Sequence, residues 1–121
     1  MRALHEAVTA SGASFDVAVK HQMLSYALGG DFRHWVCAVD VGRSGFKSYQ
    51  GAAPVKRALH VRFLYGVLLD DPQGLLRAGS SILKTLGFAS PEKVDGPLVT
   101  AFVKDAVARF DEFKASEHWF R

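Results

Sequence analysis

Asp70 and Asp71 are two adjacent acidic residues, and they are a candidate site for chemistry in this chain. Paired carboxylates can hold a hard cation or carry out acid–base chemistry. Pro72 follows them, however, and Asp followed by Pro is a typical helix start, with Asp as the N-cap and Pro in the first helical position. We therefore expect a capping role for Asp71 and keep a metal site at Asp70 and Asp71 as the alternative.

Nucleophilic and metal-dependent catalysis have little support in the sequence. His34 and Cys37 are three residues apart, and on a strand they would face opposite sides, so they would not converge on one ion. Cys37 is the one cysteine, which excludes an internal disulfide. The chain has no HExxH, no GxSxG and no phosphate-binding or dinucleotide glycine motif. We therefore favour a protein that is not an enzyme.

Positive charge is concentrated in the middle of the chain. The whole chain carries 15 Lys and Arg against 12 Asp and Glu, a net charge of +3. No acidic residue lies between Asp40 and Asp70, whereas five basic ones do: Arg43, Lys47, Lys56, Arg57 and Arg62. We expect a solvated sheet face there and keep a nucleic-acid-binding module through residues 43–62 as an alternative.

Strand-like segments dominate that middle part. Residues 35–41 are rich in strand-favouring residues and nearly all apolar, residues 46–50 alternate, and residues 82–88 predict a last strand. In residues 59–68, Val61, Phe63, Tyr65 and Val67 share one face and His60 and Arg62 the other. The glycines at 42 and 45 predict a hairpin turn. Short connections between successive strands favour antiparallel pairing.

Helices flank these strands. Leu4, Ala7 and Val8 predict a short first helix, and Ser14 is a candidate N-cap for a second in which Phe15, Val17 and Val19 would be buried. Asp71–Pro72 predicts a third. Ser90–Pro91 opens a helical turn that residues 95–97 interrupt. The last helix is amphipathic and about five turns long, with an apolar stripe of Leu98, Val99, Phe102, Val103, Ala106, Phe110 and Phe113.

The composition is that of one globular domain covering residues 1–121. Hydrophobic residues make up 49 % and charged residues 22 % of the 121 residues, and a chain of this size buries roughly two-thirds of its surface. No apolar run reaches the roughly 18 residues of a membrane span, and the first residues lack the apolar core of a signal peptide. We expect a soluble, cytoplasmic α+β domain with an antiparallel sheet of about five strands, packed with N-terminal and C-terminal helices.

Aromatic walls with a few basic groups commonly hold small anionic ligands. On that basis we predict a non-enzymatic domain that binds a small anionic ligand or a protein partner in one cleft, with no cofactor. The candidate ligand-binding residues are Tyr26, Trp35, Tyr49, Arg62, Tyr65 and Lys84. A homodimer formed through Trp119, Phe120 or an apolar sheet face is a further alternative.

Three segments carry a resemblance to a known family. Residues 20–26 (KHQMLSY), 69–76 (LDDPQGLL) and 79–88 (GSSILKTLGF) resemble motifs of the YdhG-like proteins, also catalogued as domain of unknown function 1801, in this order along the chain. The last helix resembles the C-terminal helix of that family. The resemblance covers about residues 3–115. His21 stands where that family usually has Trp.

The resemblance implies a compact α+β domain and little about activity. Some YdhG-like proteins are described as frataxin-like intracellular iron chaperones, so iron is the alternative cofactor, with Asp70 and Asp71 as its ligands. Frataxin-type iron binding relies on a dense acidic ridge, because hard cations take oxygen ligands. Here the N-terminal segment carries only Glu6 and Asp16, which counts against the iron role.

Overall fold

The computed structural model describes residues 1–42, 46–47, 54–55, 58–78 and 82–116. Its strands are β1 (Phe15–Lys20), β2 (Met23–Leu28), β3 (Cys37–Val41), β4 (Phe46–Lys47), β5 (Pro54–Val55), β6 (Leu59–Phe63), β7 (Arg77–Ala78) and β8 (Lys84–Phe88). Six of them form one antiparallel sheet in the order β1-β2-β3-β6-β8-β7, and β4 pairs with β5 in a separate two-stranded sheet.

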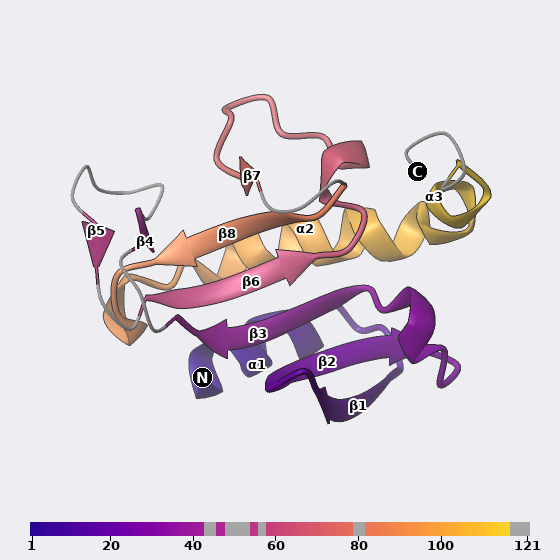
Figure 1. Cartoon of the computed structure of the whole chain (residues 1–121), viewed down its shortest axis with the longest axis horizontal. Helices are drawn as coiled ribbons and strands as arrows, with labels where there is room; N and C mark the ends of the chain where they lie inside the picture. The colour runs from indigo at the N-terminus through magenta and orange to yellow at the C-terminus, as the bar shows by residue number, and fades with distance from the viewer. Residues whose placement is uncertain (43–45, 48–53, 56–57, 79–81, 117–121) are drawn as a thin grey trace.

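The helices are α1 (Arg2–Thr9), α2 (Gly96–Ala108) and α3 (Phe110–Ser116), with short 3-10 segments η1 (Phe32–His34), η2 (Gly66–Leu68) and η3 (Pro91–Lys93). In Figure 1, α1 and α2 lie behind the six-stranded sheet. The expected α+β fold, with an antiparallel sheet packed against N-terminal and C-terminal helices, is confirmed. The sheet has five strands of five or six residues and the two-residue β7.

The two faces of the sheet differ sharply in chemistry. Paired residues of an antiparallel sheet point to the same face, and neighbours along a strand point to opposite faces. One row across the helix-covered face consists of Leu24, Val39, Val61 and Leu86. The adjacent row on the other face consists of Ser25, Ala38, Arg62 and Thr85. The sheet therefore has an apolar face toward the helices and a polar centre on the opposite face.

The core forms between the apolar face and the helices. Leu4 and Val8 of α1 and Val99 and Val103 of α2 are fully buried. The predicted apolar stripe of the last helix is confirmed, since its members belong to the core or pack against it. The stripe spans two helices, however, because the chain departs from helical geometry at Arg109, where φ is −110° and ψ is 12°.

The second helix predicted from Ser14 is wrong, because residues 15–20 form β1. Ser14 is a suitable helix N-cap, but the residues after it also suit a strand. The turn at His21 and Gln22 makes the segment one strand of a hairpin. These two residues have φ values of 52° and 66° and make a two-residue turn with both φ values positive, which matches the twist of a hairpin. The expected burial of Val17 and Val19 is also wrong, since they are 43 % and 72 % exposed.

The helix predicted at Asp71–Pro72 is also wrong, because the segment is a turn. Both oxygens of the Asp71 carboxylate accept backbone hydrogen bonds, from the N–H groups of Leu75 and Leu76, each at 2.9 Å. Gly74 has a left-handed φ of 66°, which takes the chain out of helical geometry. Asp71 thus caps a loop instead of a helix.

The segment at residues 95–97 begins a helix instead of interrupting one. The Asp95 carboxylate accepts a hydrogen bond from the Leu98 N–H at 3.1 Å, and Pro97 lies in the first turn of α2. The preceding helical turn is η3, as predicted. Three predicted strands are shorter than expected: β3 begins at Cys37, β8 begins at Lys84, and β6 ends at Phe63, before η2. Residues 43–45 of the turn predicted at 42–45 and residues 48–50 of the strand predicted at 46–50 lie outside the described residues.

Candidate functional site

Two of the three predicted ligand-binding tyrosines, Tyr26 and Tyr65, belong to the core. Tyr26 is fully buried and its hydroxyl lies 2.7 Å from His5 Nδ1. Burial, and to a smaller extent the Cys37 thiol, raises the pKa of Tyr26, so its hydroxyl stays protonated. Tyr65 is also buried, with its ring against Phe110. These rings stabilise the packing and do not line an open cleft.

The predicted cleft also required Arg62 and Lys84 to meet, and that expectation is wrong. Arg62 pairs with Thr85, whereas Lys84 pairs with Phe63. Strand alternation therefore places Arg62 on the polar face and Lys84 on the helix-covered face. Trp35 is half-buried in the connection between η1 and β3. Tyr49 lies outside the described residues.

Arg62 instead belongs to a charged cluster with Asp40 and His60 at the centre of the polar face. Arg62 Nε lies 3.3 Å from Asp40 Oδ1, and Arg62 Nη2 lies 3.4 Å from Asp40 Oδ2. His60 Nδ1 lies 3.3 Å from Asp40 Oδ1 and 3.1 Å from Arg62 Nη2. The His60 ring is pressed against the backbone of Gly42, where an added Cβ would lie 2.4 Å from Cε1. Glycine is therefore required there for lack of space.

The charge of Asp40 is well stabilised in this cluster. Burial of the carboxyl raises its pKa, but the hydrogen bond from His60 and the positive charge of Arg62 together outweigh burial, so the pKa of Asp40 lies below its ordinary value. Arg62 in turn has its charge balanced by Asp40. This cluster is best understood as an ion pair that organises the sheet, because its cation is already neutralised and offers an anion little.

A pocket of about 290 Å³ lies between residues 70–75 and one face of α2. Its apolar lining comes from Leu75, Leu98, Ala101 and Phe102, and its carboxylates come from Asp70, Asp71 and Asp105. Arg109 Nη1 lies 3.7 Å from Asp70 Oδ2 and 3.5 Å from Asp105 Oδ2. The side chain of Asp70 is 87 % exposed, so its carboxylate lies at the solvent edge of the pocket.

A metal ion gains no support at Asp70 and Asp71. A hard cation needs several oxygen ligands, but both oxygens of Asp71 already accept backbone hydrogen bonds. Asp105 is paired with Arg109. Within the described residues, no group of three or more His, Cys, Asp or Glu side chains could hold a metal ion. The iron alternative therefore rests on the family resemblance alone.

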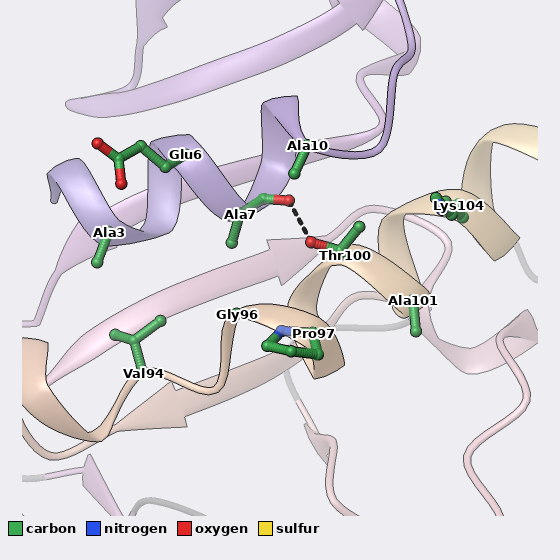
Figure 2. Close-up of a pocket in the computed structure, with 10 residues that line it drawn as sticks. All are labelled: Ala3, Glu6, Ala7, Ala10, Val94, Gly96, Pro97, Thr100, Ala101 and Lys104. Atoms are coloured by element: carbon green, nitrogen blue, oxygen red, sulfur yellow. Dashed lines mark hydrogen bonds between the residues drawn. The ribbon is translucent and has the colours of Figure 1, made fainter.

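A second hollow, of about 610 Å³, runs between α1 and α2 (Figure 2). Small residues supply most of its lining. They let the two helices pack closely, and Thr100 Oγ1 donates a 2.7 Å hydrogen bond to the carbonyl of Ala7. Figure 2 shows Glu6 and Lys104 toward its two ends. This groove is wide and open, and few of its lining groups could orient a small ligand. Ala101 lines both hollows.

Sequence reasoning missed Asp105 and Phe102 as pocket residues. A signal was available: Leu98, Ala101, Phe102 and Asp105 are spaced i, i+3, i+4 and i+7, which places them on one helix face. That face ends in a carboxylate. The sequence does not show that residues 70–75 lie beside this face of α2, because that proximity depends on the tertiary fold.

The chain matches no protein family, curated protein or solved structure in the comparisons made. The resemblance to YdhG-like proteins therefore stays a prediction. No helix in the described part of the chain has the length and apolar composition that a membrane span needs. Of the basic residues at 43–62, Arg43, Lys56 and Arg57 lie outside the described residues, so the nucleic-acid alternative also stays a prediction.

Proposed function

We propose that this chain is a non-enzymatic binding domain and that the pocket between residues 70–75 and α2 holds a small organic ammonium ion. The observation that carries the proposal is an apolar hollow of about 290 Å³ that also has three carboxylates in its lining. Ligand sites are typically apolar with a few convergent polar groups. The proposed ligand is a cation, in place of the anion expected from the sequence.

Electrostatics favour a cation at this position. Asp70, Asp71 and Asp105 carry three negative charges, and Arg109 is the cation bonded to two of these carboxylates. The excess of negative charge attracts a positive ligand and repels an anionic one. The two N–H groups of Leu75 and Leu76 hold the Asp71 carboxylate in place at the pocket lining.

An organic cation suits the pocket better than a bare ion does. Its hydrocarbon part can lie against Leu98 and Phe102, while the ammonium group remains at the wet edge beside Asp70. Burial of the hydrocarbon part supplies most of the binding free energy, because an exposed ion pair contributes only about 0.2–1 kcal/mol. At about 0.5 kcal/mol per non-hydrogen atom, benzylammonium, with its roughly eight such atoms, would bind with a Kd of about 1 mM.

The test is a titration followed by the protein's amide NMR signals, with benzylammonium, neutral benzyl alcohol and anionic benzoate as probes. We expect benzylammonium to bind with a Kd of about 1 mM, benzyl alcohol to bind about two- to fivefold more weakly, and benzoate to bind least. Asp105→Asn should weaken benzylammonium about two- to fivefold. Asp111→Asn is the matched control, since it removes the same charge from an exposed position outside the pocket lining.

Two results would overturn the proposal. One is benzyl alcohol binding as tightly as benzylammonium, because the carboxylates would then contribute nothing. The other is an equal effect of Asp105→Asn and Asp111→Asn, because the attraction would then come from net charge and not from this pocket.

A further inference from the structure

The strand β1 forms an open edge of the six-stranded sheet. Its inner side pairs with β2 through the two-residue turn at His21 and Gln22. In such a hairpin, the residues that flank the turn exchange hydrogen bonds, and hydrogen-bonded pairs then alternate along the strand. The backbone N–H and C=O groups of Phe15, Val17 and Val19 therefore point outward, away from β2.

One side-chain face of β1 is apolar for an edge strand. Val17 and Val19 are 43 % and 72 % exposed, and they account for two of the four exposed large hydrophobic residues in the described part of the chain. Both point to the same face of the sheet. Exposed edges normally carry protection, because they can pair with another strand. Here the charged residues, Asp16 and Lys20, lie on the other face of the strand.

We propose that two copies of this chain associate by antiparallel pairing of β1 with β1, about a two-fold axis that passes through Ala18. This register sets Val17 opposite Val19 of the second copy, and Asp16 opposite Lys20 of the second copy. Each contact occurs twice by symmetry. The four valines then cover one another on one face, and two opposite-charge pairs lie on the other.

The strand sequence selects this register among the few that are possible. Outward-pointing residues must oppose one another in the new ladder, so the axis can pass only through Asp16, Val17, Ala18 or Val19 if at least half of the six-residue strand is to pair. An axis at Asp16 sets this residue opposite its own copy, which places like charges together. An axis at Val17 sets Asp16 opposite Ala18 and Lys20 opposite Ser14. An axis at Val19 sets Lys20 opposite Ala18. Only the axis at Ala18 matches both charges with opposite charges and both valines with valines.

The expected dimer is weak. A single pair of six-residue strands falls below the roughly 1,200–2,000 Å² of a stable interface. We therefore expect a reversible dimer with a Kd between about 10 µM and about 1 mM. The inference does not depend on the ammonium site, because β1 and that pocket share no lining residue.

Sedimentation equilibrium of the full chain over a range of concentrations tests the proposal through a charge exchange. Asp16→Lys and Lys20→Asp should each weaken the dimer about fivefold or more, because each places like charges opposite one another. The double variant should restore the wild-type Kd within about twofold, since it exchanges both signs. Circular dichroism checks that each variant is folded.

Valine variants give a second, independent readout. Val19→Lys should abolish the dimer, whereas Val67→Lys, at an exposed valine in η2, should leave it unchanged. A wild-type chain that is monomeric at about 1 mM would overturn the proposal, and strand addition by a segment of another protein would then be the remaining use of this edge. A dimer that survives Val19→Lys, or that the double charge exchange fails to restore, would overturn it as well.

Discussion

Asp40→Asn removes one negative charge from the centre of the sheet and leaves the shape of the side chain nearly unchanged. Asp40 Oδ1 lies 3.3 Å from Arg62 Nε and 3.3 Å from His60 Nδ1, and its side chain is 19 % exposed. Removing one partner costs about 3–5 kcal/mol in a buried ion pair and about 0.2–1 kcal/mol in an exposed one. For this partly buried cluster with long contacts, we expect the free energy of unfolding to fall by about 2 kcal/mol at pH 7.

The same substitution has a predictable pH dependence. The pKa of Asp40 in the folded chain lies below the ordinary value of 3.8, so folding favours the ionised form. The stabilisation is fully present above the ordinary pKa and is lost as the pH falls through the lower, folded-state pKa. The difference in unfolding free energy between wild type and Asp40→Asn should therefore shrink as the pH falls below about pH 4.

Urea unfolding followed by circular dichroism, repeated across this pH range, measures that difference. Asp111→Asn provides the control, because this exposed residue of α3 has no partner among the described contacts; its effect should stay within about 0.5 kcal/mol. A loss below about 0.5 kcal/mol for Asp40→Asn at pH 7 would refute the reasoning. An equal loss at about pH 7 and about pH 3 would refute it too, because the effect would then not depend on the carboxylate charge.

Two further predictions concern packing and reactivity. Gly42→Ala should lower the free energy of unfolding by about 1–3 kcal/mol in urea, because the new Cβ would lie 2.4 Å from His60 Cε1; Gly96→Ala, whose Cβ would meet Ala7 at an ordinary 4.0 Å, should be nearly neutral, and equal effects would contradict this account. Burial raises the pKa of the Cys37 thiol, so a disulfide thiol reagent should react with it in urea far faster than in the native chain. Equal rates would show that Cys37 is accessible.

The sequence is sufficient to predict the elements that have a long or regular hydrophobic pattern. The apolar stripe from Leu98 to Phe113 repeats over several turns, and the alternation in residues 59–63 has a clear buried side. The hairpin of β1 and β2 was misassigned because its turn uses His21 and Gln22 at positive φ. Asn and Gly usually mark such a turn, so the sequence lacked its usual signal.

The candidate site was harder to predict because it depends on register and on loop placement. Whether Arg62 and Lys84 share a face is decided by the pairing of β6 with β8, and a shift of one residue would reverse the answer. Asp70 and Asp71 were identified from the sequence as notable carboxylates. Their chemistry changed once the fold brought Asp105 and Phe102 beside them, a contact between segments about thirty residues apart in the chain.

The most direct test of the ammonium site is a set of intermolecular NOEs from the ring protons of benzylammonium to the protein. The account predicts NOEs to the side chains of Leu75, Leu98 and Phe102, which line the apolar part of the pocket. NOEs to Ala3 and Ala10 in the groove between α1 and α2, without any to Leu98 and Phe102, would contradict it.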